Sequence, residues 1–276
     1  MSTGQDAAAD RVKKSPAGGQ RVGTWAAVAS TREPVAQRIM LTLEACAAKK
    51  RALTIVELVN ETGLAKTTVH RMCWKLVELG LLEHSDEGFS VGSKLFALAN
   101  ANPAINELRV AAIPYLIELQ RRTGAMPNLA ILSGRKSLIL DGLFTRESAR
   151  SPRLIGFSLP LHCTGVGKAI AARLDPEQRE LLLFGDRGGL PAAAKRTITS
   201  PAQLRAHLER ASQAGVAVAD EEFLPGIKSV AAGFRLRGGG VAAIGCVEAW
   251  NSPTLRHAPR AVTAAASALE RTLSGH

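Results

Sequence analysis

The sequence predicts an α+β protein with an N-terminal winged helix-turn-helix and a larger C-terminal domain of helices and antiparallel strands. The chain has 276 residues, enough for roughly two domains at about 150 residues each. Two short amphipathic helical patterns in the first 100 residues are joined through a glycine and followed by a hairpin pattern. Beyond residue 125, short apolar runs alternate with turn residues and with helical spacing, which is typical of a mixed domain.

The composition is that of a globular protein, with 46% hydrophobic and 21% charged residues. No apolar run approaches the roughly 18 residues of a membrane span, and the first 20 residues lack the apolar core of a signal peptide. We therefore expect a cytoplasmic protein that does not enter the membrane. The four cysteines stand far apart without a CxxC pair, so we expect reduced thiols and neither a zinc framework nor a cofactor.

The net charge of +11 and the pI near 10.0 favour a polyanionic partner such as nucleic acid. The excess of basic over acidic residues is unevenly distributed along the chain. Residues 1–100 carry 13 basic and 10 acidic residues, a net charge of +3, and residues 101–276 carry 22 and 14, a net charge of +8. The local placement of charge must therefore indicate whether DNA is bound.

The N-terminal elements follow from capping signals and apolar spacing. Residues 1–30 lack periodicity and predict a flexible tail, and a first helix begins after Pro34. Thr54 and Glu57 have the spacing of a capping box, which predicts the start of a second helix. After the turn at Gly63, a third helix is expected over 66–78, and Gly80 ends it.

A small hairpin completes the first domain, and two helices lead to the second. Residues 81–84 and 89–91 alternate as strands around the turn at 85–88, which makes 31–98 a winged helix-turn-helix. Residues 99–122 are expected to form linker helices, interrupted at Pro103.

The C-terminal domain is expected over 123–276. A hairpin is predicted at 129–132 and 137–144, with two further strands at 229–236 and 241–250. Helices are expected at 165–174, 176–183, 201–214 and 258–273. Ser200 supplies a cap and Pro201 a first helical position for the third of these.

The third helix has the chemistry of a DNA recognition helix. At 100° per residue, Val69, Cys73 and Leu76 fall on one stripe, and polar side chains fall on the opposite side. Arginine can bond guanine in a fork, threonine can contact a base edge or a phosphate, and lysine neutralises phosphate. The candidate DNA-binding residues are Lys66, Thr67, Thr68, His70, Arg71, Trp74 and Lys75.

Two observations leave alternatives open for this helix. Lys66, Arg71 and Lys75 also fit the solvated face of an ordinary amphipathic helix, and a winged helix can serve protein contacts alone. Asp86 and Glu87 at the hairpin tip would be repelled by phosphate.

Longer stretches resemble the IclR family of bacterial transcriptional regulators. LTIVELV from Leu53, TGLAKTTVHR from Thr62 and LVELGLL from Leu76 resemble its winged helix. LPLHCTGVGKA from Leu159, and GVAVADEE from Gly215 with the following strand, resemble its second domain. The resemblance covers roughly residues 35 to 272 in the same order.

The resemblance implies a GAF- or profilin-like C-terminal domain that binds an effector, and a homodimer or dimer of dimers on a pseudo-palindromic operator in double-stranded DNA. It also implies that the effector is a small organic acid or aromatic metabolite. By the family pattern, the effector residues would be Phe157, Leu159, His162, Thr164, Asp220, Glu221, Ser229, Gly245 and Val247, with Arg153 or Lys228 at the rim. Family members commonly carry cysteine at the position of Ser229, alanine at Cys163, and small hydroxyl residues at Gly245 and Val247. These departures indicate a more apolar or bulkier effector.

Two other classes compete with an effector-responsive regulator. An enzyme could use Cys163 as nucleophile, although His162 would point to the opposite face of an extended strand. A metal-dependent sensor could use His162, Cys163 and Asp220 as ligands. No catalytic residue and no resident metal are expected.

Overall fold

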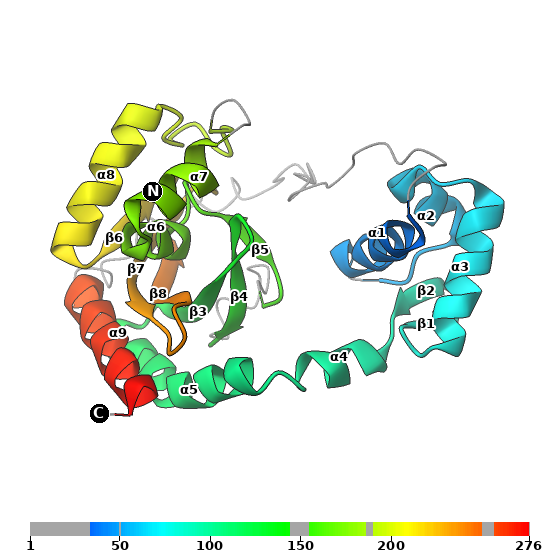
Figure 1. Cartoon of the computed structure of the whole chain (residues 1–276), viewed down its shortest axis with the longest axis horizontal. Helices are drawn as coiled ribbons and strands as arrows, with labels where there is room; N and C mark the ends of the chain where they lie inside the picture. The colour runs from blue at the N-terminus through cyan, green and yellow to red at the C-terminus, as the bar shows by residue number, and fades with distance from the viewer. Residues whose placement is uncertain (1–33, 50, 144–154, 186–189, 250–256, 276) are drawn as a thin grey trace, which may run out of the picture. The chain divides into compact units, whose positions relative to one another are not determined.

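The computed structural model describes residues 34–49, 51–143, 155–185, 190–249 and 257–275, and the chain divides into two compact units between Ala101 and Asn102 (Figure 1). The boundary lies close to the expected end of the winged helix at residue 98. The expected tail over 1–30 lies outside the described residues.

The N-terminal unit is a winged helix-turn-helix built as the sequence predicts. It contains α1 (Val35–Ala48), α2 (Ile55–Thr62), α3 (Lys66–Glu78), β1 (Leu82–Ser85), β2 (Gly88–Val91) and α4 (Ser93–Ala99). The strands β1 and β2 pair antiparallel around the expected turn. Buried side chains from α1, α2, α3 and the hairpin form one apolar core, in which Leu58, Val69 and Cys73 are fully enclosed.

The start and the end of α2 confirm the capping prediction. The Thr54 hydroxyl accepts from the Glu57 backbone N–H at 3.3 Å, and the Glu57 carboxylate accepts from the Thr54 N–H at 3.0 Å. Gly63 ends the helix with φ of 70°, in the left-handed region that glycine adopts without steric cost. The turn between α2 and α3 therefore follows directly from local sequence.

The C-terminal unit begins with α5 (Pro103–Thr123) and contains, among the described residues, a six-stranded antiparallel sheet in the order β5-β4-β3-β8-β7-β6. The strands are β3 (Met126–Ser133), β4 (Lys136–Gly142), β5 (Ser158–Pro160), β6 (Ala217–Asp220), β7 (Ile227–Arg235) and β8 (Val241–Ala249). The other helices are α6 (Gly165–Arg173), α7 (Pro176–Phe184), α8 (Pro201–Ala214) and α9 (Ala258–Ser274). The predicted α+β class is confirmed.

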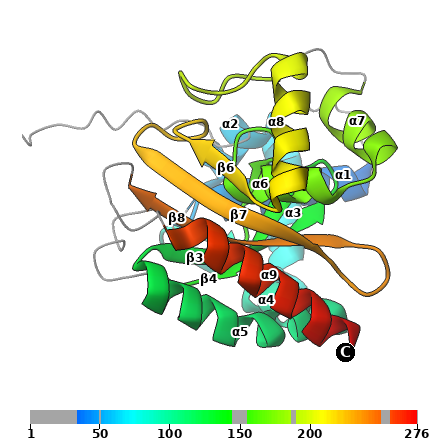
Figure 2. The same cartoon turned by 90° about the vertical axis from the view of Figure 1, so that its left-hand side faces the viewer.

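Helices cover both faces of this sheet. Figure 2 shows α9 and α5 side by side across one face, with α6 and α8 on the other side. The strand residues alternate accordingly: Ala242 and Ile244 pack toward α5 and α9, and Val241 and Ala243 pack toward α6. The α6 face carries the cavity described below.

Two short strands were not expected. Strand β6 lies in the stretch from Gly215 that resembles the family's second domain: Ala217 and Ala219 are buried, and residues 217–220 pair with β7. Strand β5 is only three residues long and pairs with β4 at the opposite sheet edge. In the described part of the chain, no helix has both the length and the apolar character needed to span a membrane.

Candidate functional site

The outer face of α3 presents most of the candidate DNA-binding residues to solvent. Lys66, Thr67, His70, Arg71 and Lys75 are exposed, and Thr68 is half-buried. Within the described residues, Lys66, Thr67 and Arg71 make no ion pair or side-chain hydrogen bond, and no side chain caps the first turn of α3. Donors therefore remain available at this end of the helix.

Trp74 connects α3 to the hairpin. Its indole N–H donates to His70 Nε2 at 3.2 Å. Its ring lies 4.7 Å from the His84 ring and 5.5 Å from the Phe89 ring, measured between centroids. With 41% of its surface exposed, Trp74 both fixes the hairpin against α3 and remains accessible to a partner.

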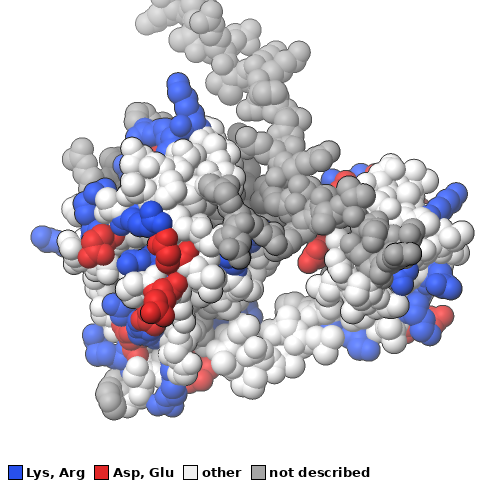
Figure 3. Space-filling view, turned by 45° about the horizontal axis from the view of Figure 1, so that its top comes forward, with Lys and Arg blue, Asp and Glu red and all other residues white. Residues whose placement is uncertain are grey.

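Charge near α3 is unevenly distributed. Lys75 forms an exposed ion pair with Glu78 at 2.6 Å, and Asp86 and Glu87 are exposed at the hairpin tip. In the view of Figure 3, Lys and Arg side chains gather along the right-hand edge of the N-terminal unit, whereas both signs are interspersed over the C-terminal unit. The exposed side of α3 around Lys66 and Arg71, which make no ion pair in the described residues, thus has the charge that suits a phosphate backbone.

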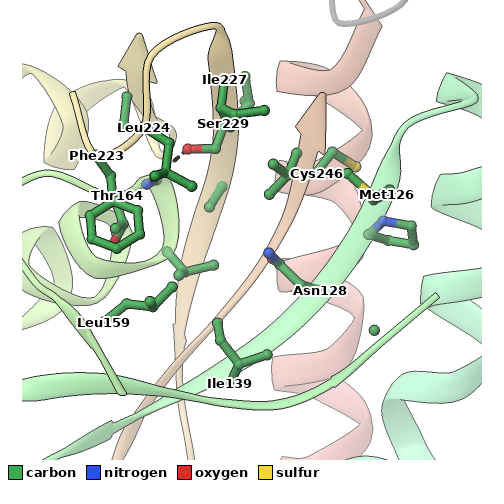
Figure 4. A pocket seen from close by; sticks show the side chains of 18 of the residues that line it. Met126, Asn128, Ile139, Leu159, Thr164, Phe223, Leu224, Ile227, Ser229 and Cys246 are labelled. Atoms are coloured by element: carbon green, nitrogen blue, oxygen red, sulfur yellow. Dashed lines mark hydrogen bonds between the residues drawn. The ribbon is translucent and has the colours of Figure 1, made fainter. Parts of the chain in front are cut away.

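The second candidate site is a cavity on the α6 face of the large sheet, here called the sheet cavity. It lies among β3, β7, β8, the start of α6 and the turn after β6, and Figure 4 shows its wall. It contains about 930 Å³ of space, part of which is open to solvent. Its wall is mostly apolar, with contributions from Met126, Ile139, Phe223, Leu224, Ile227 and Val247. A mostly apolar lining with a few polar groups is typical of small-molecule sites.

Four of the predicted effector residues line the sheet cavity: Leu159, Thr164, Ser229 and Val247. Thr164 caps α6 by accepting from the Gly167 N–H at 3.1 Å, and its own hydroxyl donates to the Pro160 carbonyl. Ser229 on β7 accepts from the Gly165 N–H at 3.0 Å, the dashed contact in Figure 4. These hydroxyls therefore hold the first turn of α6 at the cavity wall.

Asp220 and Glu221 do not line the cavity. Arg196 forms ion pairs with Asp220 at 2.7 Å and with Glu221 at 3.3 Å, and Lys228 Nζ lies 3.9 Å from Asp220. Glu221 also accepts from the Gly226 N–H and has a positive φ of 54°. Asp220 at the end of β6, Glu221 just after it and Lys228 on β7 thus form a salt-bridged cluster with Arg196 beside the site.

The other three predicted residues also lie outside the cavity lining. Phe157 packs against the apolar core under α6, and the His162 ring bonds the Pro191 carbonyl at 2.9 Å. Burial lowers the pKa of His162. Gly245 lies on β8, where an added Cβ would stand 2.7 Å from the Ala231 Cβ, so close strand packing accounts for the missing side chain. Arg153 lies outside the described residues.

Several cavity residues were missed by sequence reasoning, notably Asn128, Asp141 and Glu222. Figure 4 shows the Asn128 side chain pointing from β3 into the cavity. Both carboxylate oxygens of Asp141 are engaged, one by the Arg109 guanidinium and one by the Gly142 N–H. The alternation of β3 could have indicated Asn128, since it shares a face with the buried Ala130.

Glu222 belongs to a buried ion pair. Lys168, which is fully buried on α6, donates to Glu222 Oε1 at 2.5 Å, to the Val218 carbonyl at 3.1 Å and to His207 Nε2 at 3.4 Å. Burial lowers the pKa of the Lys168 ammonium, and the adjacent Glu222 carboxylate opposes that shift. The pair ties α6 to the turn that lines the cavity.

The structure weakens the two competing classes. Residues 161–164 form a bend before α6, so the strand geometry assumed for His162 and Cys163 was wrong. Cys163 is fully buried beside the cavity, and burial raises its thiol pKa to about 12, which disfavours the nucleophilic thiolate. Among the described residues, no three His, Cys, Asp or Glu side chains are grouped to hold a metal ion. All four cysteines are free thiols, as predicted.

Comparison with known proteins assigns both units. Residues 35–86 match the IclR helix-turn-helix domain, and residues 104–268 match the C-terminal domain of the bacterial transcriptional regulator IclR. The chain is 29% identical over 194 residues to the transcriptional repressor IclR of Escherichia coli, covering 69% of this chain and 70% of that one. It is 31% identical over 220 residues to the regulator BhcR of Paracoccus denitrificans, covering 79% of this chain and 77% of that one.

A solved structure shares both the fold and part of the sequence. It is an IclR homologue from Microbacterium hydrocarbonoxydans complexed with 4-hydroxybenzoate, 26% identical, with a TM-score of 0.75 over 87% of this chain and 98% of that chain. The relatives compared are transcriptional regulators, not enzymes. The first match lies within the N-terminal unit and the second within the C-terminal unit. The chain therefore belongs to the IclR family of transcriptional regulators, with a DNA-binding helix-turn-helix and a C-terminal effector domain.

Proposed function

We propose that the chain binds a specific operator through α3, and that a small organic acid or aromatic metabolite in the sheet cavity modulates this binding. The observation that carries the DNA part is the exposed face of α3, where Lys66, Thr67 and Arg71 stand without partners in the described residues. In helix-turn-helix proteins, the early residues of the second helix reach base edges in the major groove. Thr68, His70, Trp74 and Lys75 complete the proposed interface.

The effector part is supported by the sheet cavity and by the related structure complexed with 4-hydroxybenzoate. An effector changes DNA affinity only if it binds unequally to two states of the protein. The effector contacts that we propose are the predicted residues that line the cavity: Leu159, Thr164, Ser229 and Val247.

We also propose a homodimer, or a dimer of dimers, whose two α3 helices read the half-sites of a pseudo-palindrome. Exposed apolar side chains on α5 support self-association: Val110, Ile113 and Ile117 recur at helical spacing, with exposed fractions of 67%, 46% and 53%. Sedimentation equilibrium of the full chain, alone and with operator DNA, would give the assembly.

The DNA proposal is tested by fluorescence anisotropy with DNA from upstream of the chain's own gene, and with random DNA, over a salt series. We expect preferential binding to the upstream DNA, with an affinity that falls linearly with salt on logarithmic axes. Arg71→Ala is expected to weaken specific binding by about 1–3 kcal/mol and to relax the preference at one base pair. Arg210→Ala, an equal charge change at an exposed position of α8, is the matched control.

Equal loss on random and specific DNA would make Arg71 a phosphate contact, and equal wild-type binding to both DNAs would refute sequence-specific recognition. Adding 4-hydroxybenzoate to the preformed complex tests the effector part. A change in operator affinity supports it.

A further inference from the structure

Two residues that line the sheet cavity each carry a buried acceptor atom for which the described residues supply no hydrogen-bond donor. Glu222 is only 6% exposed, and within the described residues its Oε2 atom has no hydrogen-bond partner, although Oε1 accepts from Lys168. Asn128 Oδ1, also on the cavity wall, is likewise buried and unpartnered among the described residues. A buried acceptor without a hydrogen-bond donor destabilises the free protein, so a ligand that donates to this acceptor gains binding free energy.

The Thr164 hydroxyl and the Asp141 carboxylate of the wall are already engaged. Thr164 gives its hydroxyl proton to Pro160 and accepts from Gly167, and both oxygens of Asp141 accept hydrogen bonds. Ser229 uses its oxygen as an acceptor for the Gly165 N–H. The free hydrogen-bond acceptors among these lining residues are therefore Glu222 Oε2 and Asn128 Oδ1.

The charge of the wall disfavours an anionic group at this point. The charged side chains that line the cavity, in the part of the chain described, are Asp141 and Glu222, and both are acidic. Lys168 lies behind Glu222, where it is fully buried and engaged by three partners. A ligand carboxylate placed beside Glu222 would meet another carboxylate rather than a cation.

A cationic donor is disfavoured as well. The charges of Glu222 and Asp141 are already matched by Lys168 and Arg109, and an additional ammonium would have to leave water for an apolar cavity. A neutral hydroxyl supplies the donor without that cost.

We propose that Glu222 Oε2 is a specificity-determining acceptor of the sheet cavity, and that the preferred ligands are neutral, largely apolar molecules bearing a hydroxyl group, such as phenols. This inference rests on the proposed function of the cavity as the effector site. It narrows that function from organic acids and aromatics in general to ligands whose hydroxyl donates to Glu222.

The test uses three probes that share one ring: 4-methylphenol, 4-methylanisole and 4-methylbenzoate. They differ in carrying a donor, a methylated oxygen without a donor, and a carboxylate. Titration calorimetry on the full chain at pH 7 is expected to show 4-methylphenol binding roughly 10- to 100-fold more tightly than either of the others. Equal affinity for the phenol and its ether, strongest binding of the carboxylate, or no binding of the phenol would each overturn the proposal.

Variants separate the acceptor from cavity shape. In Lys168→Met/Glu222→Leu, which replaces the whole ion pair by apolar side chains, the affinity ratio of phenol to ether is expected to fall to near one. Arg205→Met/Glu180→Leu removes an exposed ion pair between α8 and α7, away from the cavity, and is expected to leave that ratio unchanged. Glu222→Gln, checked for native circular dichroism, provides a second variant that keeps side-chain size.

A ratio that survives both Glu222 substitutions would refute the role of this residue. Because the DNA titration of the wild-type chain needs no ligand, failure of this proposal leaves the proposed DNA recognition standing.

Discussion

Replacing Lys168 by methionine removes the cation from a fully buried ion pair and leaves the Glu222 carboxylate without compensation. Lys168 has no exposed side-chain surface and Glu222 only 7%, so water cannot take over the lost interaction. Breaking such a pair from one side costs about 3–5 kcal/mol. For a unit of this size, at about 2–4 °C per kcal/mol, the melting temperature should fall by about 6–20 °C.

The exposed pair Lys75–Glu78 supplies a matched control. Its atoms lie 2.6 Å apart, close to the buried pair's 2.5 Å, but the two side chains are 68% and 65% exposed. Lys75→Met should therefore change the free energy of unfolding by less than about 1 kcal/mol. Urea unfolding followed by far-ultraviolet circular dichroism measures both variants under one condition.

A double substitution tests the cause of the loss. Lys168→Met/Glu222→Leu removes both charges together, and apolar replacement of a buried pair is often close to neutral. We expect the double variant to regain most of the stability lost in Lys168→Met. The reasoning is refuted if Lys168→Met costs no more than Lys75→Met, or if the double variant is less stable than the single one.

Three further predictions concern other parts of the chain. Burial, with a smaller effect of a nearby ammonium, lowers the pKa of His207 from 6.5 to about 4, so the unfolded chain binds this proton first. Stability should therefore fall as pH decreases from 6.5 toward 4, and less steeply in His207→Gln when melting temperature is measured against pH. Gly233→Ala would place a Cβ 2.3 Å from the Ala169 carbonyl oxygen, so we expect a loss of about 1–3 kcal/mol in urea unfolding. Thr54→Ala removes the capping box with Glu57 and should lower the free energy of unfolding by about 1 kcal/mol.

Each of these has a control within the chain. If His207→Gln shows the same dependence of stability on pH as the wild-type chain, His207 is not the cause of the acid destabilisation. Gly240→Ala meets only a leucine side chain at 3.4 Å and should be tolerated, so equal losses at both glycines would argue against the contact with α6. Thr67→Ala removes a threonine that makes no hydrogen bond in the described residues, and an equal effect there would contradict the capping contribution.

The N-terminal unit could be predicted almost completely because its signals are local. The cap at Thr54 depends only on Glu57, three positions away. The turn at Gly63 that ends α2 depends on that glycine alone. Even the face of α3 follows from helical spacing within one element. What spacing could not show is that Trp74 packs on His84 and Phe89, because those contacts depend on how the hairpin folds back.

The cavity could be predicted only in part because its chemistry depends on distant partners. Asp220 and Glu221 were interpreted as ligand acceptors, but Arg196 lies 24 and 25 residues away in sequence and pairs with both. Glu222, adjacent to them, faces the cavity instead, and its partner Lys168 is 54 residues away. One acidic triplet thus divides between a salt-bridged cluster at the end of β6 and the wall of the sheet cavity.

The sheet order has a consequence for synthesis of the chain. The central neighbours β3 and β8 pair through Met126 and Val247, about 120 residues apart, whereas the N-terminal unit closes within its first 101 residues. At about 5–20 residues per second, the ribosome needs roughly 5–20 s to complete β8 at Ala249 after the β3–β4 hairpin ends at Gly142. During that interval the β3–β4 hairpin lacks its other neighbour, and its free edge is open to pairing with other nascent chains. Expression at lower temperature should therefore raise the yield of chains in which the C-terminal unit is correctly folded.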